Sequence, residues 1–145
     1  MKYIVSKSVE IAEMLLMEIK KNKRDRIMIG LRGDLGAGKT ATVQQLGKFL
    51  GVKEPIASPT FNLVKIYDLP DNLLGFKKLC HIDLYRLNKP SPADVSEIIE
   101  QITSQGVISA IEWPENSPQI SQIVDVTVEI KPISPTRREV EIKWS

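Results

Sequence analysis

Apolar positions recur along this chain with two different periods, so both helices and strands are predicted. Spacings of three and four residues, which place side chains on one face of a helix, predict three helices. Ser8 is predicted to cap the first, Gly51 to end the second, and Ser91-Pro92-Ala93-Asp94 to start the third. The apolar positions are Ile11, Ala12, Leu15, Leu16 and Ile19; Val43, Leu46 and Leu50; and Val95, Ile98, Ile99 and Ile102.

Short apolar runs and alternating segments predict the strands. The runs 27–31 and 107–111 are almost wholly apolar, as expected of strands that are buried on both faces. Segments 61–67 and 76–83 flank a turn-rich sequence and predict a hairpin. Alternation over 124–130 and 140–144 predicts two more strands joined by a turn with Pro132 and Pro135, and 3–5 predicts an edge strand.

One motif lies between the run 27–31 and the second predicted helix: Gly33-Asp34-Leu35-Gly36-Ala37-Gly38-Lys39-Thr40. A glycine, four free positions and Gly-Lys-Thr form the phosphate-binding loop of nucleotide triphosphatases, and the loop requires this strand before it and this helix after it. Glycines let backbone N–H groups face phosphate oxygens, while Lys39 follows the β- and γ-phosphates and the Thr40 hydroxyl ligates Mg²⁺. Further predicted contacts are Gly33, Leu35, Gly36, Ala37, Gly38 and Ala41.

The order of elements around this loop predicts the fold class. Strands alternate with helices, and the strands nearest the loop are apolar throughout. We therefore expect an α/β protein, a P-loop NTPase-type three-layer sandwich whose central mixed sheet has a parallel core and antiparallel edges. Ligands in such sheets bind beyond the C-terminal ends of the strands, so further site residues should stand where strands end.

Two carboxylates meet this criterion. Asp83 follows the apolar run 79–82, and Glu112 follows 107–111. Mg²⁺ prefers hard oxygen ligands, so either carboxylate could join Thr40 in a metal site. A strand-end cap or a salt bridge is the alternative explanation for each of them.

Two neighbouring segments carry weaker predictions. Thr60, in Ser58-Pro59-Thr60-Phe61, occupies the place where related nucleotide hydrolases have a mobile segment that senses the γ-phosphate, although a simple Ser-Pro turn explains it as well. Trp113 directly follows Glu112 and would stand at the rim of the site, with core packing as the alternative.

Length, composition and charge indicate the number of domains, the kinds of partner and the cellular compartment. A length of 145 residues predicts one domain, 1–145. The net charge of +2 gives no sign of the basic face that direct nucleic-acid binding requires. The single cysteine, Cys80, is predicted to be a buried thiol and, with no secretion signal in the sequence, favours a reducing cytoplasm. No apolar run approaches the roughly 20 residues that span a bilayer, so no membrane association is expected.

Four motifs in order closely resemble the bacterial TsaE (YjeE) family, small ATPases of tRNA threonylcarbamoyladenosine synthesis. They are the glycine loop at 33–40, Ser58-Pro59-Thr60-Phe61, His81-Ile82-Asp83-Leu84-Tyr85-Arg86 and Ile111-Glu112-Trp113-Pro114. The resemblance implies ATP hydrolysis with Mg²⁺, turning ATP into ADP within a complex with TsaB and TsaD. TsaD would carry out the transfer to the adenosine next to the anticodon, so that tRNA is met only through the complex.

The resemblance also implies roles for single residues. Lys39 and Thr40 match nucleotide and Mg²⁺ contacts, Glu112 a metal-site carboxylate, and Asp83 an acidic residue needed for hydrolysis. Thr60 matches a switch-like segment, Trp113 a rim aromatic and Ser8, more loosely, a residue near the adenine. Ala41 departs from the family, which usually has a second hydroxyl residue there; one hydrogen bond to the α-phosphate should be absent, at a cost of about 1 kcal/mol of binding.

Two other functions fit the same loop. A small-molecule P-loop kinase would need an acceptor pocket and an arginine-bearing lid, and the sequence offers only Arg137-Arg138 in a predicted hairpin turn, where solvation explains them. A nucleotide-gated binding module without catalysis would use ATP only to order the Thr60 segment for a partner.

Overall fold

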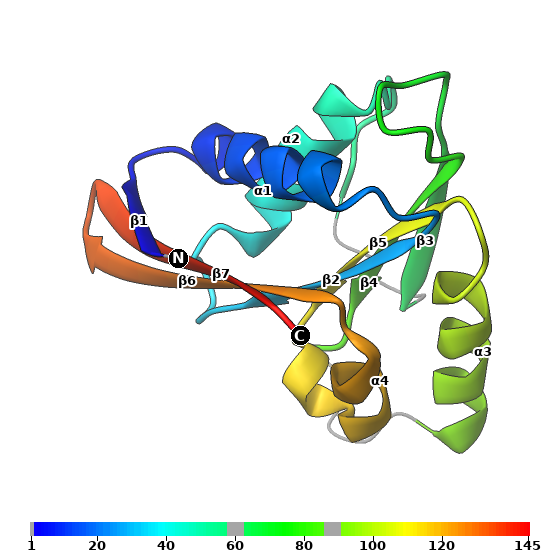
Figure 1. Ribbon diagram of the computed structural model, residues 1–145. Helices are drawn as coiled ribbons and strands as arrows, with labels where there is room; N and C mark the ends of the chain where they lie inside the picture. The colour runs from blue at the N-terminus through cyan, green and yellow to red at the C-terminus, as the bar shows by residue number, and fades with distance from the viewer. Residues whose placement is uncertain (1, 58–62, 86–90) are drawn as a thin grey trace.

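A single mixed sheet of seven strands organises the molecule, seen here in a computed structural model that describes residues 2–57, 63–85 and 91–145 (Figure 1). The strand order is β1-β7-β6-β2-β5-β4-β3, in which β6, β2, β5 and β4 are mutually parallel. At the edges, β3 pairs antiparallel with β4, β7 pairs antiparallel with β6, and β1 pairs antiparallel with β7. The strands are β1 (Lys2–Val5), β2 (Ile27–Arg32), β3 (Val64–Asp68), β4 (Lys78–Asp83), β5 (Val107–Glu112), β6 (Val126–Ser134) and β7 (Arg137–Trp144).

Helices cover both faces of the sheet, as Figure 1 shows. On one face lie α1 (Ser8–Asn22) and α2 (Lys39–Phe49), and on the other α3 (Pro92–Ile102) and α4 (Pro118–Ile123). The central strand explains the two cores: Ile27, Ile29 and Leu31 pack toward α1 and α2, whereas Met28 packs toward α3 and α4. The predicted α/β architecture with a parallel core and antiparallel edges is therefore confirmed.

The helix starts follow the predicted chemistry at α3 but not at α1. Ser91 caps α3, its side chain accepting a hydrogen bond from the Asp94 backbone N–H. Ser8 does not cap α1, because the N-cap is Lys7 and the Glu10 carboxylate accepts from the Lys7 backbone N–H instead. Ser8 is thus the first helical residue, and the prediction of a serine cap there is wrong.

The last third of the chain differs from the predicted alternation in two places. A short 3₁₀ turn, η1 (Pro114–Asn116), and helix α4 precede β6, so Val124 is the C-cap of α4 rather than the start of a strand. The predicted turn also shortens: Pro132 lies within β6, at a register irregularity. Proline is tolerated at such a site because the regular ladder is already interrupted.

Cys80 is buried, as predicted, and burial raises the pKa of its thiol to about 11, so it is not a reactive thiolate at neutral pH.

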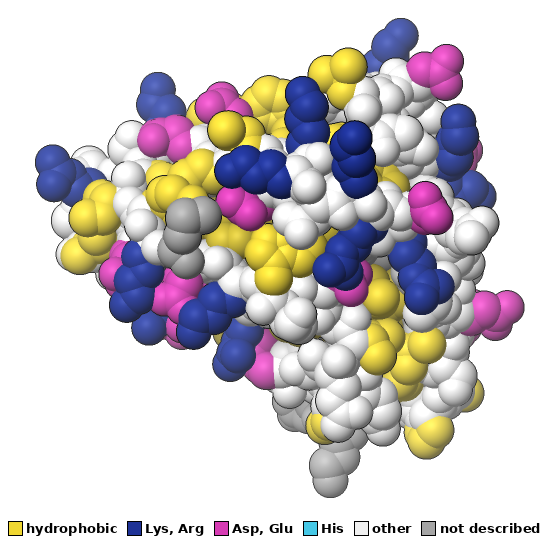
Figure 2. Space-filling view, in the orientation of Figure 1, with side chains coloured by type: hydrophobic (Ala, Val, Ile, Leu, Met, Phe, Trp, Pro, Cys, Tyr) yellow, Lys and Arg dark blue, Asp and Glu magenta, His cyan; other side chains and the backbone are white. Residues whose placement is uncertain are grey.

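On the face drawn in Figure 2, lysine and arginine side chains lie among acidic and apolar ones. Among the helices of the described residues, none is long and apolar enough to cross a membrane.

Candidate functional site

The parallel register brings the predicted site residues to one edge of the sheet. β2, β4 and β5 end at Arg32, Asp83 and Glu112, and Asp83 pairs directly with Glu112 across β4 and β5. Strand alternation then decides which side chains share a face: Leu79 and Ala110 pack toward α2, so residues an even number of positions further on face the same way. Asp83 and Glu112 therefore both point toward the N-terminal end of α2.

The glycine loop joins β2 to α2 at this edge. Gly36 and Gly38 adopt φ of 78° and 106°, a left-handed conformation that side-chain-bearing residues rarely adopt. A Cβ on Gly33 would stand 2.6 Å from the backbone oxygen of Ile130, so the loop lies directly against β6. Ala37 is buried, whereas Leu35 and Gly36 are exposed, which leaves the crest of the loop open to solvent.

Lys39 begins α2 and folds its side chain back under the loop. Its Nζ donates to the backbone oxygens of Gly33 and Asp34, the latter at 3.0 Å, and lies 4.4 Å from the centre of the Trp113 ring. The residue is only 5% exposed, and burial lowers the pKa of its ammonium from the ordinary value, opposed mainly by Glu112. Among the described residues, the contacts of this buried ammonium are carbonyl oxygens and an aromatic ring, so it is suited to receive an anion.

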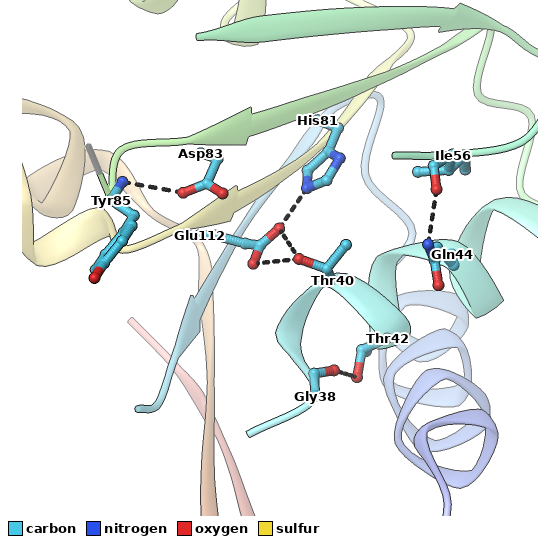
Figure 3. Close-up of polar contacts among 9 residues, drawn as sticks. All are labelled: Gly38, Thr40, Thr42, Gln44, Ile56, His81, Asp83, Tyr85 and Glu112. Carbon is cyan, nitrogen blue, oxygen red and sulfur yellow. Dashed lines mark hydrogen bonds and ion pairs between the residues drawn. The ribbon is translucent and has the colours of Figure 1, made fainter. Parts of the chain in front are cut away.

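Glu112 is the centre of the hydrogen-bond network at the site (Figure 3). The Thr40 hydroxyl lies 2.9 and 3.0 Å from its two carboxylate oxygens. His81 Nε2 lies 2.5 Å from Oε2 of the same carboxylate, and both residues are buried, at 0% and 3% exposure. Because an ionised carboxylate can only accept, Nε2 carries the proton in this contact. The Glu112 carboxylate is thus held between two partners, Thr40 and His81.

His81 belongs to the site although no role for it is predicted from the sequence. The sequence does contain a signal for His81. Residues two apart in a strand share a face, and His81 stands two positions before Asp83 in β4. Its Nδ1 is buried, with no hydrogen-bond partner among the described residues. The imidazole is therefore held in place by its contact with Glu112.

Asp83 lies beside this network, at the end of β4, and accepts a hydrogen bond of its own. Its Oδ1 accepts a hydrogen bond from the Tyr85 backbone N–H at 3.0 Å (Figure 3). Burial raises the pKa of the Asp83 carboxyl above its ordinary value, and the nearby Glu112 charge adds to that effect. Such a carboxylate holds a proton more readily than one in water, which is a property of general bases.

The raised pKa of Asp83 predicts a gain in stability for Asp83→Asn. The folded protein binds this proton more tightly than the unfolded chain, so the free energy of unfolding falls as pH rises through the raised pKa. Asparagine keeps the Oδ1 acceptor and removes the charge. Urea unfolding without nucleotide should therefore show a more stable variant at neutral pH, with the gain vanishing below the ordinary carboxyl pKa of about 3.9.

Asp68→Asn is the matched control for that measurement, since the Asp68 side chain is 90% exposed. It should change stability little at either pH. An Asp83→Asn variant that is less stable at neutral pH would contradict the assigned cause of the pKa shift.

Trp113 stands at the rim in an unusual backbone conformation. Its φ of 59° is left-handed, and its ring centre lies 5.1 Å from that of Tyr85 and close to Lys39. A bulky residue is strained in that region, so the surrounding contacts must hold it there. The aromatic is thus part of the site edge as well as of the packing.

The remaining predicted residues have separate placements. Ser8 starts α1, three residues after Val5, and is not among the residues that contact Glu112. Ala41 lies in the first turn of α2, partly exposed. Thr60 and its segment lie outside the described residues, although Ile56 shortly before them is bound to α2, where the Gln44 amide donates to its backbone oxygen (Figure 3).

Fold and site together define an α/β sandwich with a glycine-rich strand-loop-helix unit and a carboxylate hydrogen-bonded to the first turn of that helix. The family model described as "Threonylcarbamoyl adenosine biosynthesis protein TsaE" matches residues 6–140. This chain belongs to the TsaE family.

Individual relatives agree with that assignment. The tRNA threonylcarbamoyladenosine biosynthesis protein TsaE of Aquifex aeolicus is 38% identical over 98% of this chain and 96% of its own length. The Nostoc protein of the same name is 46% identical over 63% of this chain, and the Synechocystis one 44% over 64%. These two matches span only 54% and 57% of the cyanobacterial proteins, a little over half their length.

A solved structure supports the fold. The crystal structure of YdiB from Bacillus subtilis superposes with a TM-score of 0.67, covering 99% of this chain and 84% of that one. The sequence identity of 24% limits the comparison to architecture. The overall α/β fold is therefore similar to one known from a crystal structure.

Proposed function

We propose that this protein is an Mg²⁺-dependent ATPase acting in tRNA threonylcarbamoyladenosine biosynthesis, with ATP held by the loop at 33–40. Membership of the TsaE family supports the pathway. The observation that carries the activity is the contact of the Thr40 hydroxyl with both oxygens of the Glu112 carboxylate, next to the buried Lys39. A glycine loop, a lysine, a hydroxyl and a strand-end carboxylate are the parts that phosphoryl transfer to water requires.

The oxygens at this point fit a magnesium ion. Mg²⁺ binds oxygen at about 2.1 Å in an octahedron, whose neighbouring ligands are therefore about 3.0 Å apart. The Thr40 and Glu112 oxygens are separated by 2.9 and 3.0 Å. The described residues contain no group of three His, Cys, Asp or Glu side chains placed to hold a metal, which suits an ion that takes its other ligands from phosphates and water. When bound, Mg²⁺ would neutralise charge on the phosphate oxygens.

The other residues then have distinct tasks. Lys39 Nζ would exchange its carbonyl contacts for β- and γ-phosphate oxygens, gaining charge-assisted hydrogen bonds. Loop amides of residues 33–41 would bind the remaining phosphate oxygens. Asp83, with its raised pKa, would accept the proton of the attacking water, and Trp113 would shield that end of the site from solvent.

The wider setting of the reaction follows from the family. We propose that TsaB and TsaD are the protein partners, and that ATP turnover here resets or activates their complex. TsaD would transfer the threonylcarbamoyl group, and tRNA would be bound by the complex rather than by this chain alone.

Release of inorganic phosphate from ATP, measured with and without Mg²⁺ and with and without TsaB and TsaD, tests the function. We expect slow hydrolysis that needs Mg²⁺ and rises with the partners. Faster transfer of the γ-phosphate to nucleosides or metabolites than to water would identify a kinase instead. ATP binding with no phosphate release under any of these conditions would identify a binding module.

His81 is predicted to act through Glu112, as a positioning residue. His81→Leu removes the donor to Oε2, so the carboxylate loses one of its two restraints and the Mg²⁺ concentration for half-maximal turnover should rise about tenfold, in line with other residues that orient metal ligands. The KM for ATP at saturating Mg²⁺ should change little, because the described contact of His81 is with Glu112 rather than with the loop.

His81→Gln, which retains an N–H donor, is the matched variant and should recover most of the Mg²⁺ response. A merely structural histidine would instead lower the unfolding temperature in both variants with an unaltered Mg²⁺ dependence. That pattern would contradict the positioning role.

A further inference from the structure

Asn116 joins two segments of the chain that carry site residues. It is the last residue of η1, which follows Glu112 and Trp113. Its side-chain amide donates to the backbone oxygen of Leu84, just beyond the end of β4, at 2.9 Å. The two partners are 32 positions apart in the chain. The bond therefore ties the segment after β5 to the segment after β4.

The Leu84 oxygen belongs to the same peptide group as the Tyr85 N–H. A peptide group is planar, so a hydrogen bond to its oxygen also fixes the direction of its N–H. That N–H donates to Oδ1 of Asp83 at 3.0 Å (Figure 3). One rigid unit thus connects Asn116 to the Asp83 carboxylate, and each of its two hydrogen bonds polarises the group in favour of the other.

Both ends of this connection are anchored to the sheet. The Leu84 N–H donates to the Glu112 backbone oxygen at 3.1 Å, which prolongs the pairing of β4 with β5. Trp113, which precedes η1, donates its backbone N–H to the Leu31 oxygen of β2 at 3.2 Å. Asn116 therefore reaches Leu84 from a segment that is itself held in place.

The direction of the Asp83 carboxylate depends on this connection. In the part of the chain that the structure describes, the Tyr85 N–H is the single hydrogen-bond donor to the Asp83 side chain. A side chain at a strand end can turn between its rotamers, and one donor with a fixed direction selects among them. Fixing the Tyr85 N–H therefore also fixes where the second carboxylate oxygen of Asp83 points.

We propose that Asn116 is a positioning residue for ATP hydrolysis: its amide fixes the peptide group between Leu84 and Tyr85, which holds the Asp83 carboxylate toward the attacking water. The inference rests on the proposed function, in which Asp83 accepts the proton of that water. Placement of such a base matters for the rate, because a displacement of about 1 Å can cost about 100-fold. Asn116 would therefore act on turnover rather than on nucleotide binding.

Phosphate release from ATP, measured with Mg²⁺, TsaB and TsaD, tests this role in the wild type, Asn116→Ala and Asn22→Ala. Asn22 is the matched control, because its side-chain amide also donates to a backbone oxygen, that of Glu18, at 2.9 Å, in the last turn of α1. We expect kcat of Asn116→Ala to fall about tenfold, with the KM for ATP within about twofold of the wild type. Asn22→Ala should change neither quantity.

Hydrogen exchange of the Tyr85 N–H, followed by NMR without nucleotide, tests the contact itself. Loss of the Asn116 amide should free the peptide group, so this N–H should exchange several-fold faster in Asn116→Ala and at the wild-type rate in Asn22→Ala. Asn116→Gln keeps an amide donor on a longer side chain, so it should lose less turnover than Asn116→Ala.

Failure of this role and failure of the ATPase give different results. An unchanged kcat or an unchanged Tyr85 exchange rate in Asn116→Ala would overturn the role of Asn116 and leave the ATPase in place. Equal losses of turnover in Asn116→Ala and Asn116→Gln would do the same, because the donor would then not matter. A wild type that releases no phosphate would overturn the proposed function, and the role of Asn116 with it.

Discussion

Lys39→Ala is expected to weaken ATP binding about 10- to 100-fold and to reduce phosphate release to background. The ammonium is buried beneath the loop, so its contacts with phosphate oxygens would be charge-assisted and poorly screened. A hydrogen bond to a charged group contributes about 1.5–3 kcal/mol, which corresponds to that range of affinity. Calorimetric titration with ATP measures the loss directly.

ADP gives a second measurement on the same variant. The ammonium is expected to serve the β- and γ-phosphates, so ATP should lose more affinity than ADP. Lys48→Ala, an exposed lysine in the same helix, is the control and should bind both nucleotides as the wild type does. ATP affinity unchanged in Lys39→Ala would remove the lysine from the site.

Glu112→Ala is expected to impair both turnover and folding. Turnover should fall at least about tenfold, or about 1.4 kcal/mol of barrier, because Thr40 loses the carboxylate that completes the predicted metal site. Stability should fall by about 1–3 kcal/mol, since the buried Nε2–H of His81 would be left without an acceptor. Phosphate release and urea unfolding measure the two effects.

Glu112→Gln separates the two effects. The amide oxygen can still accept from His81 while the charge is lost, so most of the stability should return and turnover should remain low. The predicted signature is therefore a folded, nucleotide-binding and nearly inactive protein. Normal turnover in Glu112→Gln would show that the carboxylate serves packing alone.

Local features of the chain were predictable because their causes are close in sequence. The loop at 33–40 is one contiguous segment, and its glycines adopt the left-handed conformations that the motif requires. The start of α3 and the doubly buried β2 and β5 follow from side chains within a few positions of one another. Ser8 does not cap α1 because the cap lies one residue earlier, at Lys7. The Glu10 carboxylate accepts a hydrogen bond from the Lys7 backbone N–H there.

The short elements after Glu112 were missed for a related reason. Helix α4 has six residues, too few for a periodic pattern to emerge, and only Ile120 of it is buried. The position of α4 depends on packing against β2. A Cβ added to Gly30 of β2 would contact the side chains of Val124, which follows α4, and Pro114, which precedes it. That close approach joins parts of the chain about 90 residues apart, which no local rule describes.

By itself, the sequence determined that a glycine-rich loop stands between a buried strand and a helix, and that two carboxylates end strands nearby. Only the tertiary structure decided that Glu112 meets Thr40 and that His81 contacts the same carboxylate. These contacts join residues far apart in the chain, and they depend on strand order and register, which arise when apolar faces from the whole chain pack together.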